Sequence, residues 1–147
     1  MLNIVIQPAE ESNWGDIAAL LETCALPLDG ARKHLNSYFL AVVDGAVVGT
    51  AGLEVYGEAA LLRSVAVTPS QQGQGIGQAL VAGVEAQARR RGIKTLYLLT
   101  TNAAAYFAEL GFSIERREAA PIGLQASAEF QGACPSTATL MSRRVAR

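Results

Sequence analysis

Short runs of apolar residues, several of them alternating with polar ones, recur through the first half of the chain. Alternation with a period of two is typical of strands that bury one face. Strands are predicted at residues 3–7, 38–43, 46–56 and 59–67. The pairs Asp44-Gly45 and Gly57-Glu58 separate the last three, and such pairs favour hairpin turns. These three strands are therefore predicted to be antiparallel neighbours.

A helical spacing of apolar residues appears in two longer segments. The first contains Trp14, Ile17, Ala18 and Leu21, and the second contains Ile76, Leu80, Val84 and Ala88. Ser12 or Asn13 can cap the first helix, and the basic residues and glycine at 89–92 are typical of a helix end. A shorter helix is expected at residues 31–37.

The rest of the chain alternates between strands and helices. Strands are predicted at residues 95–101, 112–117 and 137–143, and a helix at 103–110 is followed by Gly111. No repeat, linker or low-complexity tract interrupts this order. The pattern predicts one α/β domain over residues 1–147.

Composition narrows the classes of function. Of the 147 residues, 50% are hydrophobic and 17% are charged, which suits a packed core. The formal net charge of −1 gives no reason to expect a nucleic-acid partner. No apolar run approaches the ~20 residues of a membrane span, and the N-terminus does not resemble a signal peptide.

The cysteines and the histidine suggest no metal site. Cys24 and Cys134 lie far apart in the sequence and form no C-x-x-C motif. We expect them to be free thiols in a reducing cytoplasm. The single histidine, His34, is predicted to lie on the surface, and metal sites need clustered ligands.

The segment VTPSQQGQGIGQ, residues 67–78, places three glycines at alternate positions directly before a helix. Glycine permits positive φ and leaves backbone N–H groups open, and a helix N-terminus attracts anions. The spacing excludes a dinucleotide fingerprint, because Gln78 stands where its third glycine belongs. It also excludes a P-loop, because no lysine follows Gly77. The loop is predicted to bind a phosphate group through its backbone, with a flexible turn as the alternative.

Two sequence elements resemble the GNAT family of N-acetyltransferases. The family's loop pattern, Q/R-x-x-G-x-G/A, is met by Gln72-Gly73-Gln74-Gly75-Ile76-Gly77. The family's alanine-rich helix ending in L-G-F is met by residues 103–112. The stretches LLRSVAV, YLLTTNAAAYFAELGF and EFQGACPSTATLM look like the acetyltransferase domain of N-acetylglutamate synthase and, most of all, like the arsenic-resistance N-acetyltransferases. Nothing in the composition indicates arsenic.

The resemblance implies a fold and a co-substrate. The expected fold is a mixed, mostly antiparallel sheet of about seven strands with about four helices, splayed between its fourth and fifth strands. Acetyl-coenzyme A is the expected co-substrate, with its pyrophosphate on the glycine loop and its pantetheine arm along the fourth strand. The residues expected to bind it are Val65, Ala66, Val67, Gln72, Gly73, Gln74, Gly75, Ile76, Gly77, Gln78, Thr100, Asn102 and Phe107.

Catalytic roles follow from the same resemblance. The backbone amide of Val65 is expected to polarise the thioester carbonyl. The candidate base rests on its place in the sequence instead: Glu54 lies near the end of the third predicted strand and could act through a water, with an exposed surface carboxylate as the alternative. The family's proton-donating tyrosine position is held by Phe107, and the nearby tyrosine is Tyr106, which points about 100° away on a helix. The thiol is therefore protonated by solvent or by another group. Thr100 replaces an asparagine of the family.

Two residues are candidates for binding the acceptor. Alternation places Arg63 on one strand face with Leu61, Val65 and Val67. A guanidinium there needs an anion, which is either a substrate carboxylate or an internal partner such as Glu54. Cys134 precedes the last strand at the border of the acceptor cleft, or is simply a small buried residue.

The predicted function is therefore acetyl transfer from acetyl-coenzyme A to the amine of a small, amino-acid-like molecule. The alternatives are acetylation of protein or peptide N-termini and a non-catalytic acyl-coenzyme A sensor. No nucleic acid, membrane or metal is expected as a partner, and the sequence leaves a homodimer open.

Overall fold

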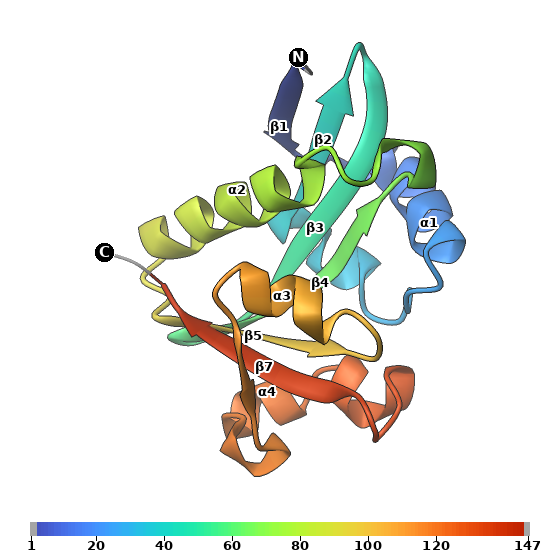
Figure 1. The fold of residues 1–147 in the computed structure, drawn as a ribbon. Helices are drawn as coiled ribbons and strands as arrows, with labels where there is room; N and C mark the ends of the chain where they lie inside the picture. The colour runs from blue at the N-terminus through green and yellow to red at the C-terminus, as the bar shows by residue number, and fades with distance from the viewer. Residues whose placement is uncertain (1–2, 146–147) are drawn as a thin grey trace.

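The computed structural model describes residues 3–145 and contains a seven-stranded sheet in the order β1-β2-β3-β4-β5-β7-β6 (Figure 1). The strands are β1 Ile4–Pro8, β2 Tyr38–Val43, β3 Ala46–Tyr56, β4 Ala59–Val67, β5 Thr95–Thr100, β6 Ser113–Glu115 and β7 Thr139–Arg144. The α-helices are α1 Trp14–Thr23, α2 Ile76–Arg90, α3 Ala104–Glu109 and α4 Ile122–Gln125. Short turns of other helix types cover Glu11–Asn13, Arg32–Ser37, Pro69–Gln71, Arg117–Ala119 and Glu129–Ala133.

The first four strands form the antiparallel half of the sheet, as the alternation predicts. β1 pairs with β2, β2 with β3, and β3 with β4. Asp44 and Gly45 join β2 to β3, and both have positive φ, at 51° and 79°. Positive φ at both central residues defines the tight hairpin turn that an Asp-Gly pair favours. The predicted bounds of β2, β3 and β4 agree with the structure.

The sheet opens in its middle. β4 pairs with β5 in parallel, but only Ala59, Ala60 and Leu61 take part on the β4 side. The remaining residues of both strands diverge, and β5 turns instead to β7 along its whole length, from Thr95 to Thr100. The predicted splay between the fourth and fifth strands is confirmed, and it leaves the second half of β4 with one unpaired edge.

Helices cover both faces of the sheet. α2 contributes Ile76, Leu80 and Val84 to the main core cluster, together with Leu53, Leu62 and Leu96 from the sheet and Phe107 from α3. α1 covers the opposite face of the first half through Ile17 and Leu21. α4 covers the second half on that same face through Leu124, against Leu61 and Leu140. α1 and α4 therefore cover the same face of the sheet on either side of the splay, and α2 covers the other face.

The largest differences from the sequence predictions lie near the C-terminus. β6 covers only Ser113–Glu115 of the predicted 112–117, and α4 and the turn Glu129–Ala133 were not predicted. The missed elements are short and have no apolar period long enough to reveal them. In the part of the chain that the structure describes, no helix is long and apolar enough to cross a membrane. The same residues contain no group of three or more potential metal ligands among His, Cys, Asp and Glu.

Candidate active site

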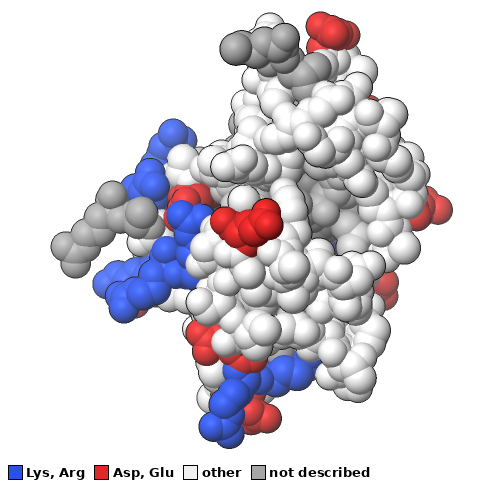
Figure 2. All heavy atoms as spheres, viewed as in Figure 1, with Lys and Arg blue, Asp and Glu red and all other residues white. Residues whose placement is uncertain are grey.

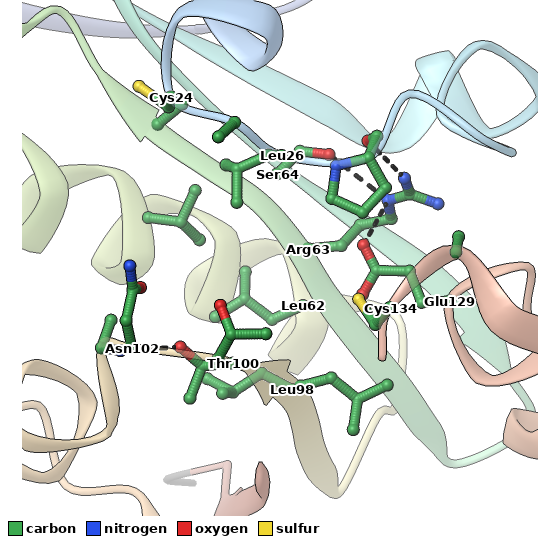
Figure 3. Close-up of a pocket in the computed structure, with 18 of the residues that line it drawn as sticks. Cys24, Leu26, Leu62, Arg63, Ser64, Leu98, Thr100, Asn102, Glu129 and Cys134 are labelled. Atoms are coloured by element: carbon green, nitrogen blue, oxygen red, sulfur yellow. Dashed lines mark hydrogen bonds and ion pairs between the residues drawn. The ribbon is translucent and has the colours of Figure 1, made fainter. Parts of the chain in front are cut away.

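A cavity of about 580 Å³ lies where β4 and β5 diverge (Figure 3). This volume is within the range of small-molecule sites. The cavity is lined by residues 24–27, Asp29, residues 62–67, Gln72, residues 98–103, Phe107, Glu129 and residues 133–135. Four segments that are distant in the sequence therefore meet around the splay.

The predicted site residues divide into two groups. The cavity is lined by the predicted residues Arg63, Val65, Ala66, Val67, Gln72, Thr100, Asn102, Phe107 and Cys134. The predicted loop residues beyond Gln72, which are Gly73, Gln74, Gly75, Ile76, Gly77 and Gln78, lie next to it at the start of α2 and do not line it. Glu54 does not line it either.

The free edge of β4 turns its backbone groups towards the cavity. The carbonyl of Val67 accepts hydrogen bonds from Gln72 Nε2 at 3.0 Å and from Cys24 Sγ at 3.6 Å. The following N–H, of Thr68, donates to Val48 on the β3 side. Backbone groups two residues apart point to the same side of a strand. The N–H and C=O of Val65 therefore point away from β3, as those of Val67 do.

A β-bulge changes the side-chain alternation in the middle of β4. The register with β3 shifts between Thr50 and Gly52, and Ser64 has a positive φ of 59°. Val65 and Val67 consequently pack against the core cluster that contains Leu62, whereas Leu61 belongs to another cluster. The prediction that Arg63 shares a face with Val65 and Val67 is wrong, because the extra residue of the bulge reverses the alternation.

The glycine loop has an open backbone at the N-terminus of α2. Gly73 and Gly75 have φ values of 82° and 84°, and no atom lies within 4 Å of a β-carbon built on either. At Gly77, by contrast, a β-carbon would collide with the hydroxyl of Tyr106. In Figure 2 the basic side chains lie near the C-terminal end of α2 and at the lower edge of the molecule, and not over this loop. The loop therefore exposes backbone groups, and not charged side chains, to a ligand.

The two aromatic residues of α3 have different surroundings. Phe107 is buried, lines the cavity and contacts Phe112 edge-on, with ring centroids 5.9 Å apart. Tyr106 is 41% exposed and does not line the cavity. The predicted helix phase is therefore confirmed, and the position that faces the cavity carries no hydroxyl.

The end of β5 is held by its own side chain. The hydroxyl of Thr100 accepts a hydrogen bond from the N–H of Ala103 at 3.0 Å, and this bond fixes the turn into α3. Asn102 lies in that turn and also lines the cavity. Thr100 thus positions the cavity wall that faces β4.

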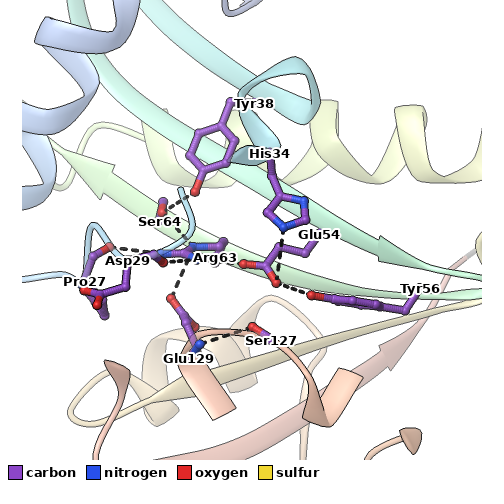
Figure 4. Close-up of polar contacts among 10 residues, drawn as sticks. All are labelled: Pro27, Asp29, His34, Tyr38, Glu54, Tyr56, Arg63, Ser64, Ser127 and Glu129. Carbon is purple, nitrogen blue, oxygen red and sulfur yellow. Dashed lines mark hydrogen bonds and ion pairs between the residues drawn. The ribbon is translucent and has the colours of Figure 1, made fainter. Parts of the chain in front are cut away.

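Arg63 is the centre of a buried polar network (Figure 4). Its side chain is fully buried, and Nη1 lies 2.7 Å from Glu54 Oε2. It donates further hydrogen bonds to the carbonyls of Asp29 at 2.7 Å and Pro27 at 3.0 Å. The internal pairing with Glu54, one of the two predicted alternatives, is confirmed. Arg63 also lines the cavity, so the second alternative, binding of a substrate carboxylate, stays a prediction.

Glu54 is a structural partner of Arg63. Its side chain is 1% exposed, so the alternative of an exposed surface carboxylate is wrong. Burial alone would raise its pKa, but the hydrogen bonds of Tyr56, Arg63 and Ser127 outweigh burial and lower the pKa below its usual value. A carboxylate of low pKa outside the cavity is poorly suited to accept a proton from a substrate. The structure therefore disfavours Glu54 as the base.

His34 lies beside this network. Its Nε2 is 3.9 Å from Glu54 Oε1, and its side chain is 24% exposed. The prediction of a surface residue is therefore only partly right. Burial lowers the pKa of His34 in spite of the nearby Glu54, so the imidazole is neutral at neutral pH.

Sequence reasoning missed Glu129, which contributes a second buried carboxylate. Its side chain is 4% exposed, and Oε2 lies 3.4 Å from Arg63 Nε. Glu129 starts the irregular turn Glu129–Ala133, where its N–H donates to Ser127 Oγ at 3.2 Å. A signal was present in the sequence, because Glu129 is the only charged residue between Glu118 and Arg143. An isolated charge in an otherwise uncharged segment is buried with a partner or serves a function.

Cys134 is buried and lines the cavity next to Glu129. Burial, followed by the charge of Glu129 and the hydrogen bond to it, raises the pKa of the thiol to about 12. Cys134 therefore remains protonated and donates its S–H to Glu129. Both predicted descriptions of Cys134, a small buried residue and a residue at the cavity border, agree with its place.

Comparison with known proteins identifies relatives over most of the chain. Residues 6–112 match the sequence profile of the acetyltransferase (GNAT) family. An amino-acid acetyltransferase of Neisseria meningitidis serogroup A is 32% identical over 127 residues, which cover 80% of this chain and 29% of that protein. An amino-acid acetyltransferase of Ectopseudomonas mendocina is 34% identical over 98 residues, which cover 63% and 23% of the two chains.

A solved structure of an N-acetylglutamate synthase has the same fold. N-acetylglutamate synthase from Neisseria gonorrhoeae, in complex with coenzyme A and N-acetylglutamate, superposes with a TM-score of 0.86 at 27% identity. The match covers 99% of this chain and 36% of that chain. The chain thus spans about a third or less of the length of these relatives. The profile match over most of the sequence and the splayed sheet agree: the chain belongs to the acetyltransferase (GNAT) family.

Proposed function

We propose that this protein transfers the acetyl group of acetyl-coenzyme A to the amine of a small, amino-acid-like acceptor. The observation that carries this function is the cavity between β4 and β5, which runs along an unpaired strand edge and lies next to an open glycine loop. Family membership and the names of the relatives support the same reaction class.

The residues at the splay fit coenzyme A. The loop at Gly73 and Gly75 has room for an anionic group close to its backbone, and α2 places its N-terminus behind that loop. The free edge of β4 can pair with an extended, amide-containing chain such as pantetheine. Gln72 lies between these two parts and lines the cavity. The co-substrate supplies the acetyl group as a reactive thioester.

The chain itself provides orientation and polarisation. The N–H of Val65 points towards the cavity and can donate to the carbonyl oxygen on which negative charge develops. Phe107 closes the opposite wall without a proton to give, so water is the proton source that we propose for the coenzyme A thiolate. A thiol with a pKa near about 8.5 does not need a strong acid as donor.

The charged lining of the cavity supports an amino-acid-like acceptor. Among the described residues, the charged side chains that line it are Asp29, Arg63 and Glu129. Arg63 is the single cation of this set and is the proposed partner of the acceptor's carboxylate. Cys134, at the same end, borders the space for the acceptor side chain. A narrower part of the proposal, which rests on short sequence motifs alone, places the chain with the arsenic-resistance N-acetyltransferases.

A thiol-release assay tests this function. Purified protein is incubated with acetyl-coenzyme A and a panel of L-amino acids, their decarboxylated amines, arsenic-containing amino-acid analogues and peptides with a free N-terminus. Turnover that requires a carboxylate next to the amine supports the proposal. Turnover of peptides alone would indicate N-terminal acetylation. Release of coenzyme A without any acetylated product would indicate the sensor alternative.

A further inference from the structure

Glu129 stands out as a buried carboxylate at the end of the cavity where Cys134 lies. Its contact with Arg63 measures 3.4 Å, longer than the 2.7 Å between Arg63 and Glu54. It is also longer than the distances common for charge-assisted hydrogen bonds. Figure 3 shows Glu129 beside Cys134, with the carboxylate between the thiol and Arg63. Glu129 is thus the loosely held member of the network.

The network contains more negative than positive charge. Arg63 supplies one cation, and Glu54 and Glu129 supply two carboxylates. His34 is neutral at neutral pH, because burial lowers its pKa. Arg63 and Glu54 are paired at close range, which leaves Glu129 as the carboxylate in excess. An ammonium group that enters the cavity would balance this charge.

We propose that Glu129 binds the acceptor's ammonium group and acts as the general base that removes its proton. This role of Glu129 rests on the acetyl transfer proposed above. Glu129 takes the place that the sequence suggested for Glu54, because Glu129 lines the cavity and Glu54 does not. The same arrangement suits a zwitterion, since Arg63 lies next to Glu129 and can face the carboxylate.

The electrostatic surroundings of Glu129 fit a base that works at neutral pH. Burial raises its pKa, Arg63 opposes this effect, and Glu54 adds to it, so that the pKa reaches about 7. The other titratable or charged groups that face it are Cys134 from its own segment and Tyr38 from β2, while Arg117 faces Cys134. A base whose pKa lies near the working pH is efficient, because it is partly ionised and still basic.

The proton balance of the reaction is complete with these groups. The ammonium first gives one proton to Glu129, and the nitrogen lone pair is then free. The C–N bond forms as the C–S bond to coenzyme A breaks. The nitrogen loses a second proton, which reaches the departing thiolate through water, and Glu129 releases the first proton to solvent. No oxidant, reductant or metal is required.

The test is the pH dependence of kcat/KM for Glu129→Gln, with Glu129→Asp and Glu118→Gln as companions. Glu118 is an exposed carboxylate of the same part of the chain, 77% exposed, and serves as the matched control. The wild type should lose kcat/KM below about pH 7, where Glu129 becomes protonated. Glu129→Gln should depend instead on the free amine, so its kcat/KM should rise up to the acceptor's own pKa. For an acceptor whose pKa is two units above the assay pH, kcat/KM of Glu129→Gln should be about a hundredfold below that of the wild type. At high pH the difference between the two proteins should narrow to less than about tenfold.

Further readings separate a base from a structural residue. Acetyl-coenzyme A should raise the melting temperature of every variant by the same amount. Glu129→Asp should have reduced activity but should keep the acidic limb of the profile, which is the fall of kcat/KM at low pH. A Glu129→Gln enzyme that equals the wild type, or is reduced equally at every pH, would overturn the role of Glu129 and leave the acetyl transfer standing. If Glu129→Gln does not fold, a Glu129→Asp profile without the acidic limb would overturn it instead. A wild type that acetylates no acceptor would overturn the function and the base together.

Discussion

Arg63 Nη1 lies 2.7 Å from Glu54 Oε2, and both side chains are almost completely buried. Their strands, β4 and β3, are adjacent, and Arg63 pairs with Gly52 whereas Glu54 pairs with Leu61, so the two residues are diagonal neighbours in the antiparallel pair. The pair fixes the bulged part of β4 against the loop that supplies the carbonyls of Pro27 and Asp29. Arg63 therefore links the strand edge along the cavity to the loop that forms its rim.

We expect Arg63→Met to destabilise the protein by about 3–5 kcal/mol, because it leaves two buried carboxylates without their cation. Chemical denaturation at pH 7.5 measures the loss. The double variant Arg63→Met/Glu54→Gln should be more stable than the sum of the single changes predicts, with a coupling of about 1–3 kcal/mol. Additive effects would show that the 2.7 Å contact contributes nothing specific.

Arg63 also allows a test of the acceptor's carboxylate. If the guanidinium binds it, Arg63→Met should lower kcat/KM for an amino acid about thirtyfold to several hundredfold, equivalent to roughly 2–4 kcal/mol. The matching amine without a carboxylate should be a poor substrate of the wild type and almost insensitive to the change. Because the variant is expected to be less stable in either case, only equal losses of kcat/KM for both acceptors would assign Arg63 to structure alone.

The glycine loop is tested by a pair of equally strained substitutions. Gly75 has a φ of 84°, which costs any other residue, although Asn and Asp tolerate it best. We expect acetyl-coenzyme A to raise the melting temperature of the wild type and of Gly75→Asn, but not that of Gly75→Asp. Only Asp adds a negative charge where the pyrophosphate is proposed to bind. An equal ligand-induced shift in folded Gly75→Asp would rule out this loop as the phosphate site.

Tyr106 should have little catalytic importance. Its hydroxyl lies over Gly77 at the start of α2, and the side chain does not line the cavity. We therefore expect Tyr106→Phe to reduce kcat less than tenfold, measured at saturating acetyl-coenzyme A. A reduction of several hundredfold in a folded variant would mean that the phenol reaches the thiolate during the reaction.

The sequence predicted the parts of the site that depend on local patterns. Strand bounds at β2, β3 and β4, the Asp44-Gly45 turn and the phase of Phe107 on α3 all follow from spacing and turn chemistry. The glycine loop was recognisable because its function requires missing side chains at fixed positions.

The rest depended on long-range pairing. The bulge at Ser64 places a non-glycine residue at positive φ, and nothing in LLRSVAV reveals it. Tyr38 supports that conformation from another strand, since its hydroxyl lies 2.7 Å from Ser64 Oγ. The cavity position of Glu129 likewise depends on a segment without periodicity, and only its isolation as a charge was visible in the sequence.

The raised pKa of Glu129 has a consequence for stability that needs no substrate. Its pKa is about 7 in the folded protein, against an ordinary value of 4.5. Between these values the unfolded chain has lost the proton and the folded protein still binds it. Stability therefore falls as the pH rises through this window, because the folded state binds more protons than the unfolded state. The loss is complete above pH 7 and amounts to about 3 kcal/mol at most.

We accordingly expect Glu129→Gln, which cannot ionise, to gain stability over the wild type as the pH rises from 5 to 8. Denaturation midpoints at several pH values measure the difference between the two proteins. His34 has the opposite effect, since its lowered pKa makes stability rise with pH up to its ordinary pKa of 6.5. It is present in both proteins, so its contribution largely cancels. The stability difference between Glu118→Gln and the wild type should not change with pH, because Glu118 is exposed. A Glu129→Gln difference that is equally flat would mean that Arg63 holds Glu129 ionised throughout, and such a carboxylate would be too weak a base for the amine.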